Sequence, residues 1–210
     1  MAHTASDIAG MSLFTIYGER KYMSQNERVR FLSALSVLTD ERDRTFCEMM
    51  FWTGCRPSEA LALTARNIDL DERTVVIRSL KKRRELKGKH FRAVPLPGAF
   101  IERLDDVHEL RALQSGSDRG VEARLWDFCR TTGWRRLRTV MDTAEITGVR
   151  ASGRGLRHTY GVHAVITDVP ETRIQIWLGH ASLKTTAIYL NAVGPEDRII
   201  ARRMWNVGAL

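Results

Sequence analysis

The sequence has few cysteines, no long apolar run and fewer acidic than basic residues. Its 210 residues include three cysteines, Cys47, Cys55 and Cys129, which lie far apart and form no CxxC pair. This pattern argues against a disulfide framework and a zinc site, and favours reduced cysteines used in packing. No stretch approaches the roughly 18 consecutive apolar residues of a membrane span. The opening residues also lack the charged-then-apolar order of a secretory signal. We therefore expect a cytoplasmic protein with no membrane partner.

The deficit of acidic residues points to a kind of partner. Lys and Arg together number 33 and Asp and Glu 25, which gives a net charge of +8 at pH 7. A strongly basic domain is typical of nucleic-acid binding when its cations cluster, and the alternative is a basic surface without a function. The 43% hydrophobic and 28% charged residues are ordinary for a globular protein, and the length suits one domain.

Helical signals begin after a short lead-in. Residues 1–22 show no periodicity, and we interpret them as an N-terminal arm before a single domain at 23–210. Ser24 and Glu27 stand at capping-box spacing and predict a helix start. A second helix is predicted within 39–54, ending at a glycine, and a short third helix begins at a proline. From Gly98 onward the periodicity is helical, with predicted helices over 99–114, 131–146, 154–167, 170–178, 184–192 and 195–205 and a loop at 114–120.

Two short segments have strand character instead. "RTVVIRS" at 73–79 alternates and is rich in β-branched residues, and "KHFRAVPL" at 89–96 is predicted to be its hairpin partner. The loop between them is rich in Lys and Arg. The sequence therefore predicts a mixed α/β fold that is mainly helical, with one small antiparallel β-sheet.

Four segments contain polar residues that a packed core does not need. In "TGCRPSEALAL", Arg56 follows a helix-ending glycine and Glu59 lies one turn later, although a surface ion pair is the simpler interpretation. In "SLKKRRELKGKHFRAVPL", the hairpin can push Lys87 or Lys89 into a DNA groove. The alternatives for that run of cations are a solvated loop and a nuclear-import-like signal.

The other two segments lie near the end of the chain. In "RGLRHTYGVHAV", Arg154, Arg157 and His158 share one helical face and would repel one another unless an anion lay among them. His163, on the same segment, is interpreted as a core or edge residue. In "LGHASLKTTAIYLN", His180 precedes Tyr189 by nine residues. A tyrosine in such an apolar run is more often part of the core than a nucleophile.

Together and in this order, the four segments resemble the tyrosine recombinase (phage integrase) family. "TGCRPSEALAL" is similar to the family's first box, "LKGKHFRAVPL" to its lysine-bearing hairpin, "RGLRHTYG" to its second box and "WLGHASLKTTAIYLN" to its third. The resemblance covers roughly residues 23 to 205. It implies the catalytic-domain fold of that family over residues 23–210.

The resemblance also implies roles for individual residues. Two arginines would grip the scissile phosphate, a hairpin lysine would protonate the leaving oxygen, and a tyrosine would be the nucleophile. The implied catalytic residues are Arg56, Lys87, Arg157, His180 and Tyr189, with Lys89 as the reserve lysine and Glu59 and His158 in support. The implied DNA contacts come from the hairpin and from a later basic helix: Lys81, Lys82, Arg83, Arg84, Lys89, Arg92, Arg135, Arg136 and Arg138.

The chain departs from the family pattern in two places. Arg154 stands where the second box usually has histidine, and an arginine cannot act as a general base near neutral pH. It can still donate to a phosphate oxygen, and we predict that catalytic role. Family members usually also carry a separate core-binding domain before the catalytic one, and here only about 22 residues precede the first predicted helix. The chain is then naturally minimal, part of a longer protein, or dependent on an accessory DNA-binding protein.

The implied function is site-specific recombination of double-stranded DNA through a 3′-phosphotyrosine intermediate on Tyr189. It requires neither a metal nor a cofactor, because guanidinium groups can neutralise the phosphate. The family acts as a tetramer on DNA, and the stripe at Ile200, Ala201, Met204 and Trp205 would dock on a neighbouring protomer or on its own core. Two alternatives remain open: a type IB topoisomerase-like nicking–closing enzyme, and a DNA-binding accessory protein with weak or no catalysis.

Overall fold

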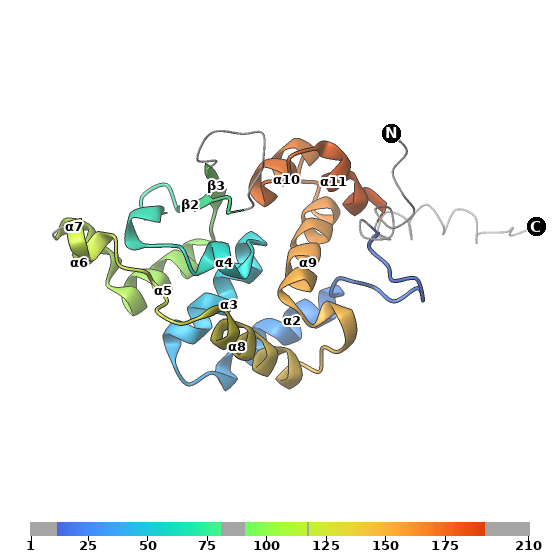
Figure 1. Ribbon diagram of the computed structural model, residues 1–210, viewed down its shortest axis with the longest axis horizontal. Helices are drawn as coiled ribbons and strands as arrows, with labels where there is room; N and C mark the ends of the chain where they lie inside the picture. The colour runs from blue at the N-terminus through green and yellow to red at the C-terminus, as the bar shows by residue number, and fades with distance from the viewer. Residues whose placement is uncertain (1–11, 81–90, 117, 192–210) are drawn as a thin grey trace, which may run out of the picture.

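The computed structural model describes residues 12–80, 91–116 and 118–191, and it consists mainly of helices with a small sheet on one side (Figure 1). Figure 1 shows α9, α10 and α11 gathered on one side of the molecule, with the sheet, α5, α6 and α7 on the other side and α3 and α4 between them. The prediction of a mainly helical α/β fold with one small antiparallel sheet is confirmed. The predicted helix over 195–205 lies outside the described residues.

The helices follow the sequence signals closely where capping residues are present. Ser24 forms a full capping box with Glu27 at the start of the first described helix, as predicted. The helices are α2 (Gln25–Ala34), α3 (Glu41–Thr53), α4 (Pro57–Ala60), α5 (Gly98–His108), α6 (Leu110–Ser115), α7 (Asp118–Val121), α8 (Arg130–Thr143), α9 (Gly153–Ile166), α10 (Glu171–Leu178) and α11 (Leu183–Ala187). Short 3₁₀ segments cover Leu35–Val37, Ala65–Asn67, Gly148–Arg150 and Ile188–Asn191.

Helix α3 is the centre of the main core. It packs against α5, α8 and α9, and Phe46, Met49 and Met50 on it are fully buried. The helix ends at Gly54, whose left-handed φ of 60° closes the last turn. A Cβ atom at Gly54 would also lie 2.9 Å from the side chains of Leu178 and Tyr160. The end of α3 can therefore approach α9 and α10 only because this residue is glycine.

The sheet has three antiparallel strands in the order β1 (Ile68–Asp69), β2 (Thr74–Arg78) and β3 (Phe91–Pro95). Val75 pairs with Val94 and Ile77 pairs with Arg92. All four side chains lie on the buried face, because alternate residues of a strand point to the same side. This face borders α4 and α10, so the sheet brings Arg92 toward the elements that carry the functional site.

Three predicted helical boundaries are wrong in detail. The helix expected over 99–114 is broken at Glu109, whose φ is 53°, and the break allows both Leu104 and Leu110 to be fully buried. In one continuous helix these two positions would face different directions. The loop expected at 114–120 contains the end of α6 and most of α7. The helix expected over 184–192 ends at Ala187 and continues as a 3₁₀ segment.

The described part of the predicted N-terminal arm is packed onto the domain. Leu13 and Tyr22 are buried, and Phe14 forms a β-bridge with Arg20. Leu13 and Tyr22 belong to a second, smaller core, which we call the minor core, and Phe14 packs against it. The buried members of the minor core are Leu13, Tyr22, Val162, Ala164, Ile174, Leu178 and Tyr189. The described residues of the predicted arm, 12–22, thus contact the domain that the sequence places at 23–210.

Candidate active site

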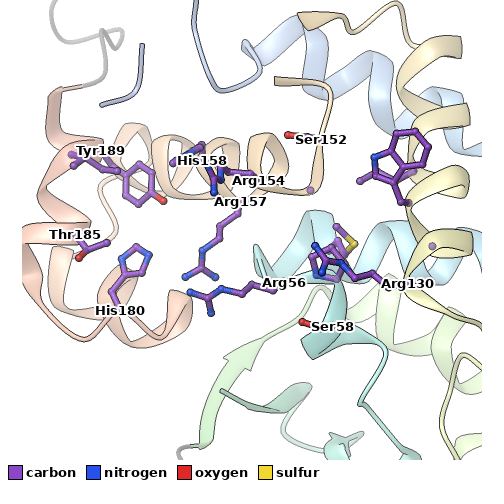
Figure 2. Close-up of a pocket in the computed structure, with 17 residues that line it drawn as sticks. Arg56, Ser58, Arg130, Ser152, Arg154, Arg157, His158, His180, Thr185 and Tyr189 are labelled. Carbon is purple, nitrogen blue, oxygen red and sulfur yellow. The ribbon is translucent and has the colours of Figure 1, made fainter. Parts of the chain in front are cut away.

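A cavity of about 730 Å³ opens between the first turn of α4, the start of α8, the start of α9 and the segment that follows α10. Arg56, Arg157, His180 and Tyr189, which are distant in sequence, all line it. Figure 2 shows the guanidinium groups of Arg56 and Arg157 side by side, with the hydroxyl end of Tyr189 and the ring of His180 directed toward them. Segments that are far apart in the sequence thus supply the wall of one pocket.

Arg157 is held in place by two backbone carbonyls. Its side chain donates to the carbonyl oxygen of Gly54 at 3.0 Å and to that of Leu178. These carbonyls stand at the ends of α3 and α10, where the negative end of the helix dipole favours a cation. Burial, together with the neighbouring charge of Arg56, lowers the pKa of Arg157 to about 10. The guanidinium is therefore charged at neutral pH and fixed in direction.

Arg56 is oriented by a buried carboxylate. Glu59, one turn along α4, accepts from Arg56 Nη1 at 2.7 Å and from the backbone N–H of Arg56 at 3.0 Å. Its other partner is Arg92 Nη2, at 2.6 Å. Burial alone would raise the pKa of Glu59, but the charge and hydrogen bond of Arg92, with the contacts from Arg56, lower it on balance. The carboxylate stays ionised and holds both arginines.

Arg92 lies in the interior and not on the DNA-facing surface that the sequence predicted. Its side chain is 4% exposed, and its donors reach Trp177 O at 2.7 Å, Ser79 Oγ at 3.1 Å and Glu59. Each of the three guanidinium nitrogens thus donates to a protein group, which fixes the side chain inside the domain. The strand alternation that places Arg92 on the same face as Val94 was the signal for burial. We therefore reassign Arg92 from DNA contact to support of Arg56.

Replacement of Glu59 by glutamine tests this support. Glu59→Gln keeps the shape but leaves two guanidiniums without their counter-charge, and we expect a loss of about 3 kcal/mol in the free energy of unfolding. DNA cleavage per folded molecule should fall at least about tenfold, because Arg56 loses its orientation. Urea unfolding and single-turnover cleavage measure the two effects. Glu48→Gln is the matched control, since Glu48 is also buried and pairs with Arg103 outside the pocket; equal loss of cleavage in both variants would contradict the proposed support.

Tyr189 is both a core residue and a wall of the pocket. Only 1% of the residue is exposed, and its ring belongs to the minor core. The ring makes an edge contact with His158 at 5.9 Å and a stacked contact with His180 at 6.1 Å between centroids. Burial raises the pKa of Tyr189 to about 12, and the charges of Arg157 and Arg56 oppose that rise. The apolar residues around Tyr189 in the sequence thus predicted its burial correctly. The hydroxyl end nevertheless faces the pocket that holds Arg56 and Arg157.

The place of the Tyr189 ring depends on a glycine of α9. A Cβ atom at Gly161 would lie 2.5 Å from the ring atoms of Tyr189, closer than real Cβ contacts occur. The ring therefore rests directly on the helix backbone at this residue. An alanine at this position would have to push the tyrosine away from Arg157.

Gly161→Ala is expected to reduce DNA cleavage by at least about a hundredfold, because displacement of a reacting group by about 1 Å is that costly. The helix itself should tolerate the change, since alanine is favoured over glycine in a helix interior by roughly 1 kcal/mol. Single-turnover cleavage with a thermal melt separates the two effects. Gly98→Ala is the control, because a Cβ there meets the end of the flexible Arg73 side chain. Full activity of Gly161→Ala would show that the ring position is unimportant.

The two histidines of the pocket are neutral at neutral pH. His180 forms a hydrogen bond between Nδ1 and Thr186 Oγ1 at 2.9 Å. Burial, with the charges of Arg157 and Arg56, lowers the pKa of His180 to about 3. Burial, with the charges of Arg154 and Arg157, lowers the pKa of His158 to about 4. A neutral His180 can accept or donate a hydrogen bond at the ring nitrogen that does not face Thr186.

The remaining predicted site residues divide into three groups. Arg154 is exposed on the pocket wall, one turn before Arg157 and His158. On α8, Arg136 pairs with Asp43 at 2.6 Å and Arg138 pairs with Asp142 at 2.9 Å, and with Arg135 they lie outside the pocket lining. The hairpin cations lie outside the described residues: Lys81, Lys82, Arg83, Arg84, Lys87 and Lys89.

Sequence reasoning missed two other residues of the pocket wall. Arg130 and Trp134 line the cavity from the first two turns of α8, and neither was singled out from the sequence. Their i, i+4 spacing was the available signal, since it puts them on one face of a helix already expected to be basic. Among the described residues, no group of three or more His, Cys, Asp or Glu side chains could hold a metal ion, and no helix is long and apolar enough to cross a membrane.

A family comparison, a sequence comparison and a structure comparison all match this chain to integrases and recombinases. Residues 21–193 match the phage integrase family. The chain is 33% identical to tyrosine recombinase XerC of Proteus mirabilis over 175 residues, which are 80% of this chain and 52% of that protein. It resembles the crystal structure of XerA recombinase, with a TM-score of 0.67, 26% identity and coverage of 87% of this chain and 64% of that one. It shares the fold of XerH site-specific recombinase bound to its difH substrate, with a TM-score of 0.67, 21% identity and coverage of 89% and 55%. The chain thus spans about half the length of the curated relative.

Proposed function

The chain belongs to the phage integrase family, and we propose that it is a site-specific DNA recombinase that breaks and rejoins strands through Tyr189. One observation carries the proposal: the hydroxyl end of Tyr189 faces the paired guanidiniums of Arg56 and Arg157 in one pocket. Two such cations, one of them fixed by helix-terminal carbonyls, form a site for a single phosphodiester. The recombinase identity of XerC, the curated relative, supports the same activity.

The chemistry follows from the charges in the pocket. The pentacoordinate transition state of a phosphodiester carries more negative charge than the ground state, and the two arginines stabilise that added charge. The phenolic oxygen of Tyr189 forms a bond to phosphorus while the bond from phosphorus to the 5′ oxygen breaks. The product is a 3′-phosphotyrosine, which retains the energy of the broken linkage, so a 5′ hydroxyl can reverse the reaction without a cofactor.

Two protons must move during cleavage. Tyr189 must lose its proton as its oxygen attacks, and the charges of Arg157 and Arg56 favour that loss because they stabilise the phenolate. His180 lies beside the ring, but its pKa of about 3 makes it too weak a base to hold the proton. Arg154 remains protonated and donates to a phosphate oxygen, because guanidinium cannot serve as a base. The departing 5′ oxygen needs a proton from another group, and we propose Lys87 for that role, with Lys89 as the reserve. Both belong to the hairpin loop, outside the described residues.

Double-stranded DNA is the proposed partner, and a tetramer on two duplexes is the proposed assembly. Exchange between two duplexes breaks four strands, and each copy of the chain has one Tyr189 to form the bond. The proposed backbone contacts are Arg135, Arg136 and Arg138 on α8 with the hairpin cations Lys81, Lys82, Arg83, Arg84 and Lys89. Residues 23–210 are proposed as the catalytic domain, with an accessory DNA-binding protein as a further partner.

Covalent trapping tests the proposed function. Nicked suicide duplexes taken from the DNA that flanks the gene are incubated with the protein in a metal chelator. We expect a protease-sensitive adduct linked to the 3′ end of the cut strand, with the nucleotide remnant on Tyr189 in mass spectrometry. Tight binding without an adduct would favour a DNA-binding accessory protein. Relaxation of supercoiled DNA without sequence preference or synapsis would favour a type IB topoisomerase-like enzyme.

A further inference from the structure

The active-site cavity extends beyond the reacting groups, toward α8. Arg130 and Trp134 line that end of the cavity and stand at i and i+4 on the helix, so they lie on one face. Figure 2 shows Arg130 reaching from α8 toward the pocket that holds Arg56 and Arg157. Trp134 is 55% exposed although it lines the pocket. An indole in this position is available to a ligand and is not needed to fill the core.

The direction of this face is fixed by the packing of α8. Gly133, Leu137, Val140 and Met141 form the buried side of the helix. At Gly133 there is no space for a side chain, because a Cβ atom would lie 2.9 Å from Phe46 Cζ. The helix therefore approaches the main core closely, and the adjoining face with Arg130 and Trp134 cannot rotate away from the cavity without losing that contact.

The arginines around this end of the cavity differ in whether they have a carboxylate partner. Arg56 pairs with Glu59, and Arg136 and Arg138 on α8 pair with aspartates. Arg130 and Arg154, by contrast, have no carboxylate partner among the side chains that the structure describes. Arg130 on α8 and Arg154 on α9 line the same cavity, and two such guanidiniums favour an anionic ligand there. The exposed indole of Trp134 lines the same end of the cavity and offers a flat apolar surface. A ligand that carries both a phosphate and a ring would fit this combination.

A nucleotide has this combination of groups, and we propose that Arg130 and Trp134 form a subsite for the nucleotide next to the scissile phosphate. Arg130 binds the flanking phosphate, and the indole of Trp134 packs against the deoxyribose and base edge. The inference rests on the proposed function, since it takes DNA as the ligand. Trp134 is in this view a positioning residue: it holds the strand so that the scissile phosphate reaches Arg56 and Arg157.

The test uses the Tyr189→Phe chain, so that binding is measured without cleavage, and a short duplex of mixed sequence as the probe. The parent is compared with Trp134→Ala, Trp134→Phe and Arg130→Ala by fluorescence anisotropy over a range of salt concentrations. Trp134→Ala should weaken binding about tenfold and leave the salt dependence unchanged. Arg130→Ala should reduce the slope of log affinity against log salt by about one, as expected for one lost phosphate contact. Trp134→Phe should retain most of the affinity.

A second readout reports on the indole directly. Comparison of the parent with Trp134→Phe isolates the emission of Trp134 among the five tryptophans, and bound duplex should protect it from acrylamide. Arg111→Ala is the control for a general charge effect, because Arg111 pairs with Asp105 outside the cavity. Its salt slope should match that of the parent.

The failures are distinguishable. If the parent binds the duplex but Trp134 stays open to acrylamide and Trp134→Ala binds equally well, the subsite is wrong and the proposed function stands. Protection of Trp134 by self-association of the chain, without DNA, would likewise overturn the subsite. Absence of any duplex binding by the parent would overturn both the subsite and the proposed function.

Discussion

Tyr189→Phe is expected to abolish the covalent adduct and to reduce strand cleavage by at least about a thousandfold, since it removes the attacking oxygen. Affinity for DNA should stay within about twofold of the parent. The physical reason lies in the packing: the phenyl ring keeps its place on Gly161 and in the minor core. The hydroxyl itself has no hydrogen-bond partner among the described residues, so its loss leaves no buried group unpaired. Adduct formation on suicide duplexes and anisotropy binding measure the two quantities.

The stability of this variant is a check on its interpretation. Because the hydroxyl makes no hydrogen bond among the described residues and the ring keeps its place in the minor core, Tyr189→Phe should unfold at about the same urea concentration as the parent. A variant that loses both adduct and stability would mean that the hydroxyl has a structural role. An adduct that persists would identify another residue as the nucleophile and overturn the assignment.

Arg157→Lys is expected to lower single-turnover cleavage by at least about a hundredfold while the positive charge is retained. A lysine ammonium is a point charge without the planar fork of a guanidinium. It cannot both donate to Gly54 O and Leu178 O and present a flat pair of donors to a phosphate. Loss of one such fixed donor typically costs a factor of about a hundred to a thousand. One of the two carbonyls is also left unpaired in a buried place, which should cost about 2 kcal/mol of stability.

Arg103→Lys is the matched control for this substitution. Arg103 has a buried partner as well, the carboxylate of Glu48, but its side chain is partly exposed and stands outside the pocket. It should retain cleavage and nearly all stability. Equal cleavage by Arg157→Lys and the parent would mean that charge alone, and not the geometry of the guanidinium, stabilises the transition state.

Local sequence patterns predicted much of the fold. The capping box at Ser24 and Glu27 fixed a helix start that the structure confirms, and the alternation in 73–79 and 89–96 identified the hairpin. The break at Glu109 was not predictable, because it depends on the burial of Leu110 by residues distant in sequence. Periodicity reports which side of a segment is apolar, but not where tertiary packing will bend it.

The candidate site was accessible to sequence reasoning only in part. Arg154, Arg157 and His158 were expected on one face of a helix, yet the structure buries Arg157 against two carbonyls and leaves Arg154 exposed. Those carbonyls belong to residues whose position follows from the ends of other helices. The burial of Arg92 could have been read from the pattern of its strand, and its charge led to the opposite expectation. Charge alone does not distinguish a cation that binds a ligand from one that holds its neighbour.

The wall behind Tyr189 combines residues from near both ends of the described chain: Leu13 and Tyr22 before α2, and Ile174 and Leu178 on α10. During synthesis, Arg56 and the whole of α3 are made long before this tyrosine leaves the ribosome. Arg157 gains its partner Leu178 O only after α10 has been made, and Tyr189 is made later still. Neither the fixed cation nor the proposed nucleophile is therefore in place until the first and last described segments have met.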